Sequence, residues 1–264
     1  MLGFIGTGNM ATAIIKGVIS SGMLSGEEIA VFDICADKVK ALADLYGVKV
    51  LADAKQIAAE CDKVVLSVKP NVFPSLLGEI GSVLKEKNPL IISIAAGKTL
   101  SFIAEYLPYE ARIVRVMPNI NAKVGAAVSA YCGNENAAES DLAFVKELCE
   151  SFGIAVNIEE KLFSIYSAIG GCSPAFAYMF IDSLARAAVK NGMPKAQALE
   201  VAAGAVMGSA KMILQSSEHP WALVDQVCSP GGTTIEGVAA LQKGSFEALV
   251  GEAVEASYNK DKRL

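Results

Sequence analysis

Residues 2–11, LGFIGTGNMA, constrain the fold more than any other stretch of this chain. A short apolar run, typical of a buried strand, ends in Gly6-Thr7-Gly8, and a helical pattern begins at once. Gly6, Gly8 and Ala11 match G-x-G-x-x-A, in which small residues allow a tight turn and let a pyrophosphate approach the helix N-terminus. A strand-to-helix turn without a ligand has the same spacing, so both interpretations stay open here.

The rest of the first half alternates predicted strands with predicted helices. The strands are short, almost entirely apolar runs at residues 29–33, 48–51, 64–68, 90–94 and 113–117. Such runs are buried on both faces, as in a parallel sheet covered by helices. Residues 124–131 and 154–158 predict two further strands, with Ser140 capping the helix between them. Gly47 is predicted to close one earlier helix and Asp53 to cap another.

The second half has a different pattern. No strand signal follows Lys161, and Pro174, Pro194 and Pro220 each suit the first position of a helix. The predicted helix at 195–216 is small and apolar on nearly all faces, so it must be buried. We therefore predict two domains, 1–160 and 161–264, and a homodimer that hides part of the second; a monomeric bundle is the alternative.

Composition and charge exclude several classes of function. The segment 162–181 has no charged side chain and is long enough to span a bilayer, but Gly170-Gly171 and Ser173-Pro174 interrupt it. We therefore expect two buried helices with a break at Gly170-Gly171, and no membrane association. The net charge is −5 and the few arginines do not cluster, so nucleic acid is not an expected partner.

The cysteines and the histidine limit the chemistry further. The six cysteines show neither C-x-x-C nor metal-ligand spacing, which indicates free thiols in a reducing compartment and no metal site. Because His219 is the single histidine, a histidine-based triad, dyad or polyhistidine metal site is excluded unless this one residue carries it. Met1 directly precedes the first strand, so we expect no leader peptide and a cytoplasmic protein.

Several predicted strands end in small or polar residues. In open parallel sheets ligands bind at the carboxyl ends of the strands, so these ends should share one rim. They are Gly6-Thr7-Gly8, Ser67-Val68-Lys69-Pro70, Ala95-Ala96-Gly97 and Met117-Pro118-Asn119. Small residues at 95–97 would let a flat ring or a ribose lie against the backbone. Lys69 is the only cation among them and is either a ligand contact or a solvated loop lysine.

Asp33 ends the second predicted strand. A carboxylate at this position can accept hydrogen bonds from the ribose hydroxyls of NAD and would repel a 2′-phosphate. Neither Ile34, Cys35 nor Ala36 supplies the arginine that an NADP site often uses, and Lys38 is the nearest cation. The coenzyme is therefore expected to be NAD(H) or NADP(H).

Residues 225–236, DQVCSPGGTTIE, predict a second ligand site. Thr233-x-x-Glu236 has the pattern of a capping box and predicts a helix that starts at Thr233. Gly231 and Gly232 would then present free N–H groups at the positive end of the helix dipole. With the hydroxyls of Ser229, Thr233 and Thr234, this loop indicates an anion site sized for a carboxylate; an ordinary capped turn is the alternative.

Over essentially its whole length the chain resembles the pyrroline-5-carboxylate reductase family. The stretches that carry the resemblance are residues 3–10, 68–70, 94–97, 116–119, 173–176, 208–212 and 229–234. The resemblance implies an α/β fold in which an N-terminal Rossmann-type, mostly parallel sheet precedes a C-terminal all-α dimerisation domain. It also implies dimers that in this family often assemble into rings, commonly decamers.

The resemblance also implies roles for individual residues. The expected coenzyme contacts are Ile5, Gly6, Thr7, Gly8, Asn9, Met10, Asp33, Ser67, Val68, Lys69, Pro70, Ala95, Ala96 and Gly97. The expected substrate contacts are Asn119, Ser229, Gly231, Gly232, Thr233 and Thr234. The implied reaction is hydride transfer from the nicotinamide to C5 of a protonated cyclic imine, which gives L-proline. Thr234, the expected catalytic residue, would hydrogen-bond the ring nitrogen.

Two stretches depart from the pattern of the family. Asn119-Ile120-Asn121-Ala122 stands where the family usually has Asn-Thr-Pro-Ala. Residues 169–174, IGGCSP, replace a more usual Leu-Ser-Gly-Ser-Gly-Pro. Gly170 in place of serine, and the added Cys172, affect the expected detail of the pocket but not the class of reaction.

Two other functions are weighed against this one. A β-hydroxyacid dehydrogenase would have the same general architecture, but that class places a lysine on the interdomain helix and residues 162–181 contain none. A non-catalytic nucleotide-binding or redox-sensing protein would use Cys172 or Cys228 as its responsive thiol, because these cysteines lie near glycine-rich segments.

Overall fold

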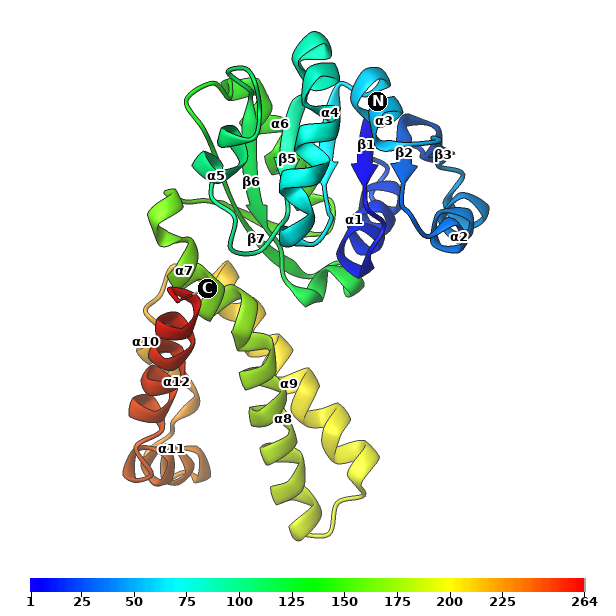
Figure 1. Ribbon diagram of the computed structural model, residues 1–264. Coiled ribbons are helices and arrows are strands. Elements are labelled where there is room, and N and C mark those ends of the chain that lie inside the picture. Colours follow the sequence, from blue (N-terminus) through cyan, green and yellow to red (C-terminus); the bar gives the residue numbers. More distant parts are fainter. Residues whose placement is uncertain (264) are drawn as a thin grey trace. The chain divides into compact units, whose positions relative to one another are not determined.

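The computed structural model describes residues 1–263, which form two compact units. The first comprises Met1–Gly171 with the short segment from Asp261 onward, and the second is Cys172–Lys260 (Figure 1). The chain thus divides at 171/172, and the boundary predicted at 160/161 stays a prediction. Each unit is described by itself.

The first unit is built on one eight-stranded sheet. Its strands are β1 (Leu2–Ile5), β2 (Ile29–Phe32), β3 (Lys49–Val50), β4 (Lys63–Leu66), β5 (Leu90–Ser93), β6 (Ile113–Met117), β7 (Ala127–Gly133) and β8 (Gly153–Asn157). The order is β3-β2-β1-β4-β5-β6-β7-β8, and every neighbouring pair is parallel except β6 and β7. The mostly parallel sheet predicted from the sequence is therefore confirmed. Because the order reverses between β1 and β4, their carboxyl ends flank a crevice where ligands bind in such sheets.

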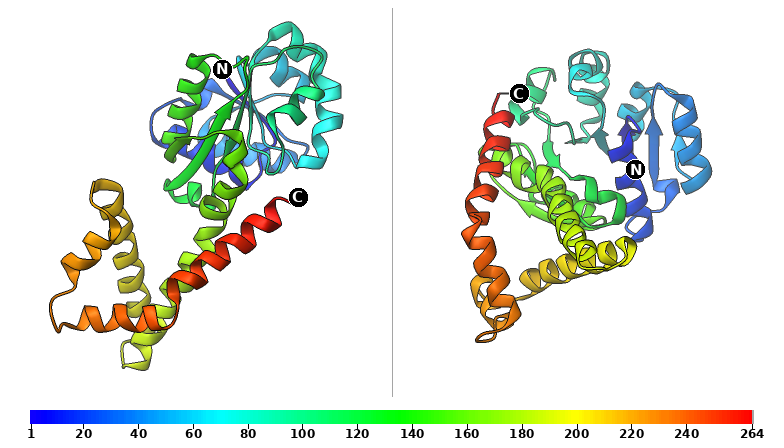
Figure 2. Two further views of the ribbon diagram at one scale, coloured as in Figure 1. Left: turned by 90° about the vertical axis from the view of Figure 1, so that its left-hand side faces the viewer. Right: turned by 90° about the horizontal axis from the view of Figure 1, so that it is seen from below.

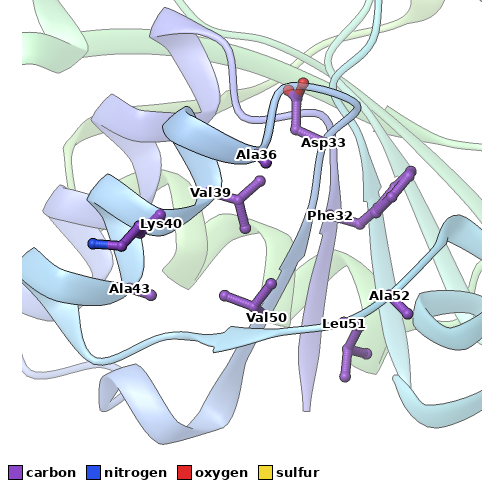
Figure 3. A pocket seen from close by; sticks show the side chains of 9 residues that line it. All are labelled: Phe32, Asp33, Ala36, Val39, Lys40, Ala43, Val50, Leu51 and Ala52. Atoms are coloured by element: carbon purple, nitrogen blue, oxygen red, sulfur yellow. The ribbon is translucent and has the colours of Figure 1, made fainter.

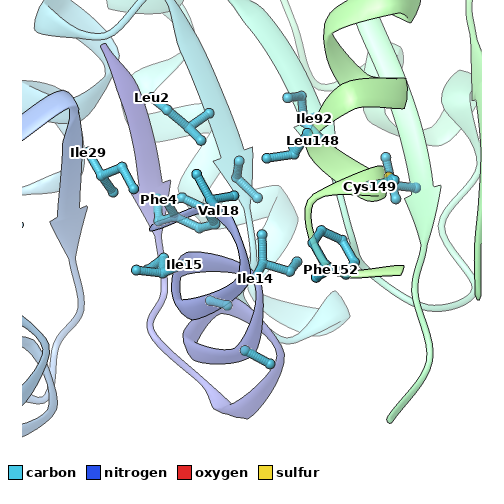
Figure 4. Close-up of a cluster of buried hydrophobic side chains, with 14 of the residues drawn as sticks. Leu2, Phe4, Ile14, Ile15, Val18, Ile29, Ile92, Leu148, Cys149 and Phe152 are labelled. Carbon is cyan, nitrogen blue, oxygen red and sulfur yellow. The ribbon is translucent and has the colours of Figure 1, made fainter. Parts of the chain in front are cut away.

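Helices cover both faces of this sheet (Figure 1). They are α1 (Asn9–Ser20), α2 (Ala36–Tyr46), α3 (Ala54–Glu60), α4 (Phe73–Lys87), α5 (Leu100–Glu105) and α6 (Glu139–Glu150). One apolar cluster packs α1, α2 and α6 on the sheet, and Figure 4 shows Ile14 of α1 on the side toward Phe152 and Ile15 on the opposite side. A second cluster packs α3, α4 and α5 on the other face. This double covering explains why the strands are apolar throughout.

The approach of α1 to the core depends on a glycine. A Cβ on Gly17 would lie 2.5 Å from Cβ of Phe152, closer than two carbon atoms can pack. The helix therefore lies directly on the phenylalanine that follows α6, and this contact fixes where the N-terminus of α1 points.

Local signals in the first unit are mostly confirmed. Gly47 ends α2 in the left-handed conformation with φ +68°, and Asp53 caps α3 by accepting a hydrogen bond from the Gln56 N–H at 2.8 Å. Ser140 is not the cap of α6, because the helix begins at Glu139 and the Asp141 carboxylate accepts from the Ala138 N–H at 3.0 Å.

The strand predicted at 124–131 begins later than expected. Residues Ile120–Val124 form a 3-10 helix, η3, and β7 starts only at Ala127. Asn119 causes this shift: its side-chain oxygen accepts from the Asn121 N–H at 3.2 Å, which starts the helical turn, and Gly125 ends the turn with φ +70°. Shorter 3-10 helices also occur at η1 (Gly26–Glu28), η2 (Pro70–Val72) and η4 (Glu160–Leu162).

In the uncharged segment 162–181 an α-helix begins at Ser173 with Pro174 in its first turn, as predicted, but the chain at Gly170-Gly171 stays helical and does not break. The chain runs through α7 (Phe163–Tyr166) into a π-helical turn, Ser167–Cys172, and on into α8 (Ser173–Lys190). The wider turn leaves the Gly170 carbonyl oxygen available, and Nδ2 of Asn119 donates to it at 2.8 Å. Within residues 1–263 no helix is both long and apolar enough to cross a membrane.

The second unit is entirely helical in its described residues. After α8 come α9 (Lys195–Gln215), α10 (Pro220–Val227), α11 (Thr233–Lys243) and α12 (Phe246–Asp261). Helices α8 and α9 form a hairpin, and the views of Figure 2 show them side by side. The buried apolar cluster of this unit holds only three alanines, Ala185, Ala198 and Ala202.

The apolar helix α9 is not buried within a single chain. Met207 is 72% exposed, Leu214 is 69% exposed and Val201 is 61% exposed. The sequence-based expectation that this helix is buried thus requires a second molecule, because one copy of the chain leaves most of its apolar surface in water.

Pro194 caps α9 from outside the helix, whereas Pro220 takes the first position of α10 as predicted.

Candidate coenzyme and substrate sites

The first unit contains a cavity of about 510 Å³ at the carboxyl ends of β1, β2 and β4. Its position is the crevice at which the strand order reverses. The residues that line it are Ile5, Gly6, Gly8, Phe32, Asp33, Ile34, Lys38, Asp53, Ala54, Ser67, Val68, Lys69, Val72, Ser75, Leu76 and Glu79.

Gly6, which follows β1, packs directly against Ser67, which follows β4, and both residues line this cavity. Gly6 has φ +96°, and a Cβ would lie 2.8 Å from the carbonyl oxygen of Ser67. Ser67 also forms two hydrogen bonds here: its N–H donates to the Ile5 carbonyl at 3.0 Å, and its hydroxyl donates to the Gly6 carbonyl. The tight turn predicted at Gly6 is therefore present, and the Ser67 backbone leaves no room for a side chain at position 6.

Gly8 has a different task. Its backbone is extended, with φ −68°, and a Cβ would meet no atom within 4 Å. It is the N-cap of α1, and no side chain caps this helix. The first N–H groups of α1 thus face open space beside the cavity, at the positive end of the helix dipole. Open backbone at a helix N-terminus fits the pyrophosphate of a dinucleotide.

The Asp33 carboxylate lies at the end of β2 and holds the glycine turn in place. Its Oδ2 accepts from the Thr7 N–H at 2.6 Å and from the Thr7 hydroxyl at 3.1 Å, while Oδ1 accepts from the Cys35 N–H at 2.9 Å. Partial burial raises the pKa of Asp33, but the hydrogen bonds from Thr7 and Cys35 and the charge of Lys38 outweigh it. The pKa of Asp33 is lowered as a result, so the group is ionised at neutral pH.

The predicted coenzyme residues divide into two groups. Ile5, Gly6, Gly8, Asp33, Ser67, Val68 and Lys69 line the cavity. Thr7, Asn9, Met10 and Pro70 lie beside them in the chain, and Ala95, Ala96 and Gly97 follow β5, whose neighbour in the sheet is β4. Sequence reasoning missed the wall formed by residues 72–79. These residues carry no motif of their own. They could have been predicted only from their place in the chain, because the first turns after β4 must face the same crevice.

A second, shallower cavity of about 420 Å³ lies between α2 and β3 (Figure 3). Its walls are aliphatic, including Val39 of α2 and Val50 of β3. Phe32 and Asp33 border both cavities, and in Figure 3 the Asp33 carboxylate is at one end of the aliphatic group. The charged residues that line this second cavity are Asp33 and Lys40.

Asn119 is more deeply placed than a surface ligand contact. It is 6% exposed, its Nδ2 donates to the Gly170 carbonyl, and its Oδ1 accepts from the Asn121 N–H. These bonds use one of the two amide hydrogens and fix the orientation of the carboxamide. Asn119 therefore holds the π-helical turn, and the remaining hydrogen is the part of the group that a ligand could use.

The loop at residues 229–234 belongs to the second unit. Gly231 is left-handed with φ +69°, Gly232 is the N-cap of α11, and the Gly232 N–H donates to the Ser229 carbonyl at 3.0 Å. The predicted capping box does not form. Thr233 is the first helical residue, not the cap, and no side chain caps α11.

The absence of a cap leaves the start of α11 available to a ligand. The hydroxyls of Ser229, Thr233 and Thr234 lie in the same short loop as the uncapped N–H groups. A Cβ on Gly232 would lie 2.3 Å from Oγ of Ser229, so only glycine lets this hydroxyl lie against the turn. Free N–H groups and hydroxyls at the positive end of a helix suit a carboxylate.

The buried cysteines are unreactive, and the acidic, cysteine and histidine side chains do not form a metal site in the described residues. Burial raises the pKa of Cys61 and Cys132 to about 11 and that of Cys149 to about 12, so these thiols stay protonated. Cys172 and Cys228 are partly exposed. Among residues 1–263, no group of histidine, cysteine and carboxylate side chains could hold a metal ion.

The doubly covered sheet, the open glycine turn and the acidic residue after β2 define a dinucleotide-dependent oxidoreductase with a helical second unit. Comparison with known families narrows this class. Residues 1–97 match the model described as NADP oxidoreductase, coenzyme F420-dependent, and residues 160–264 match that of pyrroline-5-carboxylate reductase dimerisation.

Individual relatives agree with these models. Pyrroline-5-carboxylate reductase of Escherichia coli is 43% identical over 100% of this chain and 97% of its own length, and that of Arabidopsis thaliana is 37% identical over 100% and 95%. The solved pyrroline-5-carboxylate reductase of Coxiella burnetii superposes with a TM-score of 0.94 at 31% identity, covering 99% and 97% of the two chains. The NADP-bound enzyme of Plasmodium falciparum gives 0.85 at 33% identity, with the same coverage. The chain belongs to the pyrroline-5-carboxylate reductase family.

Proposed function

We propose that the protein reduces 1-pyrroline-5-carboxylate to L-proline with NAD(P)H, the final step of proline biosynthesis. The observation that carries this proposal is a chain of this family in which two helices, α1 and α11, begin at a glycine N-cap without a side-chain cap. The start of α1 suits a pyrophosphate and the start of α11 suits a carboxylate. The full-length likeness to pyrroline-5-carboxylate reductases disfavours the dehydrogenase and redox-sensor alternatives.

The coenzyme is held by the first unit. The N–H groups that follow Gly8 take the pyrophosphate, and residues 67–70 and 95–97 lie against the rest of the dinucleotide. When bound, NAD(P)H supplies the hydride. Gly6 and Ser67 keep the strand ends rigid, so the turn does not reorganise when the coenzyme binds.

The substrate carboxylate binds at residues 229–234, to the free N–H of Thr233 at the start of α11 and to the hydroxyl of Ser229, while the Gly232 N–H stays bonded to the Ser229 carbonyl. The Thr234 hydroxyl hydrogen-bonds the ring nitrogen and holds C5 in line for the hydride. If the imine binds protonated, no strong general acid is needed, which agrees with a chain that has a single histidine. Catalysis then rests on the positioning of two reactants. Asn119 contributes by holding the Gly170 turn, with one amide hydrogen left for the substrate.

The working protein is a homodimer formed through the second unit, which can assemble further into a decamer, and it acts in the cytoplasm. Support comes from the large exposed apolar side chains of α9 and from the match to a dimerisation domain at residues 160–264. The two domains of the functional assignment are 1–160 for the coenzyme and 161–264 for substrate binding and dimerisation.

A direct assay tests the reaction. Purified protein with pyrroline-5-carboxylate should oxidise NADH or NADPH, seen as loss of near-ultraviolet absorbance, and should form L-proline in equal amount by chromatography. Thr234→Ala should lower kcat by about 10- to 100-fold, because one hydrogen bond to a charged ring nitrogen is lost, with the Kd for coenzyme unchanged. Thr234→Ser, which keeps the hydroxyl, should recover most of this loss. Absence of substrate-dependent oxidation with either coenzyme contradicts the proposal.

A further inference from the structure

The charge and the hydrogen-bonding capacity of Asp33 bear on which coenzyme this chain selects. The carboxylate borders the 510 Å³ cavity at the end of β2, where the adenosine ribose of a dinucleotide lies in this type of fold. It is fixed there by the bonds from Thr7 and Cys35 described above, so it cannot turn away from a ligand.

The carboxylate has little capacity left for further bonds. An ionised carboxylate offers about four lone-pair sites. Oδ2 receives two donors from Thr7 and Oδ1 receives one from Cys35, which leaves one site, on Oδ1. A ribose hydroxyl can donate to that site. A 2′-phosphate, largely doubly ionised near neutral pH, has no hydrogen to donate and meets a fixed negative charge.

The other charges around the cavity do not compensate. Its ionisable residues are Asp33, Asp53 and Glu79 on the acidic side and Lys38 and Lys69 on the basic side. The charge of Lys38 already acts on Asp33 and helps to lower its pKa. No guanidinium lines the cavity within the described residues, so nothing provides the bidentate phosphate contact that arginine would give.

We propose that Asp33 is the specificity-determining residue for the coenzyme and makes this chain select NADH over NADPH. The proposal rests on the proposed use of a nicotinamide coenzyme and names the member of that pair. Asp33 takes a ribose hydroxyl on Oδ1 and excludes the 2′-phosphate, while its Oδ2 holds the glycine turn. It acts as both a ligand contact and a positioning residue, and the two roles reside on different oxygens.

Calorimetric titration of the intact protein with NADH and with NADPH, without substrate, tests this directly. Wild type should bind NADH at least about 10-fold more tightly than NADPH. Asp33→Ser should reduce that ratio by about 10-fold or more, mainly by tighter binding of NADPH. Thr7→Val, which removes a donor to Oδ2 and leaves the charge, should weaken both coenzymes and keep the ratio.

Ile34→Arg covers the case in which Asp33→Ser does not fold. Ile34 is 96% exposed, so a guanidinium there should leave the Asp33 bonds intact and tighten NADPH alone. Equal or tighter binding of NADPH by wild type overturns the proposal, as does a ratio that neither Asp33→Ser nor Ile34→Arg changes. Because no pyrroline is present, NADH selectivity without turnover would contradict only the proposed reaction, and turnover with an NADPH preference would contradict only this inference.

Discussion

At the scale of single residues, the two glycines of the N-terminal turn have separate functions. Gly6 is required by the fold, because a Cβ there would strike the Ser67 carbonyl and its φ of +96° disfavours any other residue. Gly8 has an ordinary extended backbone and no atom near its missing Cβ. The fold therefore does not require glycine at this position, and we predict that its missing side chain leaves room for a ligand at the start of α1.

This difference predicts opposite phenotypes for two identical substitutions. Gly6→Ala should lower the free energy of unfolding by about 2 kcal/mol or more, through strain and a clash with Ser67. Gly8→Ala should leave it within about 0.5 kcal/mol and yet weaken coenzyme binding by about 10-fold or more. Urea unfolding and calorimetric titration of both variants provide the check. A stable Gly6→Ala, or a Gly8→Ala that binds normally, contradicts the assignment.

The Asp33 carboxylate also predicts a pH dependence of stability. Its pKa is lower in the folded protein than in the unfolded chain, so its contribution is fully present above the ordinary aspartate pKa of about 4 and is lost as the pH falls through the lower folded value. The free energy of unfolding of wild type should exceed that of Asp33→Asn by about 1–2 kcal/mol from pH 8 to about 5, and the gap should close below about pH 4. A gap that widens on acidification, in urea unfolding at each pH, contradicts the assigned bonds.

At the scale of elements, the π-helical turn explains one departure from the family pattern. Gly170 stands where serine is usual, and a Cβ at Gly170 would lie 2.7 Å from Cζ of Tyr166. The ring occupies that space because the Tyr166 hydroxyl donates to the Val128 carbonyl of β7 at 2.7 Å. Gly170 and Tyr166 are thus coupled by packing, because the tyrosine ring occupies the volume that a side chain at position 170 would need.

A double-mutant cycle tests this coupling. Gly170→Ser alone should lower the free energy of unfolding by about 1–3 kcal/mol, because the new side chain overlaps the tyrosine ring. In a Tyr166→Leu background, which frees the space near Cζ, the same change should cost less, by about 1 kcal/mol or more. Thermal and urea unfolding of the four proteins give the coupling energy. Strict additivity would show that the ring does not occupy the position of the missing side chain.

At the scale of the whole molecule, the two units differ in how far they can be stable alone. The first unit buries two large apolar clusters, one on each face of its sheet. The second buries only three alanines in its cluster while α9 exposes Val201, Met207 and Leu214. We infer that the second unit completes its core against another copy of the chain, in agreement with its match to a dimerisation domain, and that its folding is linked to association.

Charged substitutions on matched exposed residues test where the subunits meet. Met207→Glu in α9 should abolish the dimer in sedimentation at micromolar concentration and lower the melting temperature, because it places a carboxylate in an apolar interface. Leu45→Glu in α2 is the control, since Leu45 is 70% exposed and Met207 72%. The control should keep the wild-type mass, and the melting temperature of wild type should rise with concentration. A dimeric Met207→Glu protein would place the interface elsewhere.

The sequence by itself determined the alternation of strands and helices, the mostly parallel sheet and the positions of the two glycine turns. It could do so because these features are local: apolar period, glycine at left-handed backbone and short polar caps act within a few neighbouring residues. Even so, local signals assigned caps to Ser140 and Thr233, whereas the N-cap positions are Ala138 and Gly232. Side-chain preference alone does not specify which of several adjacent residues starts a helix.

Only the tertiary structure decided what these residues contact. The local pattern does not encode the Thr7 donors to the Asp33 carboxylate, the Val128 carbonyl that fixes the Tyr166 ring over Gly170, or the amide that Asn119 gives to Gly170. Most of these partners are brought together by strands and helices distant in the chain, so no periodicity marks them. The same holds for α9. The sequence showed that its surface is apolar, but only the structure showed that this surface is exposed within one chain. A pattern reports which side chains avoid water, and only the packed molecule shows which neighbours cover them and which surfaces remain for a partner.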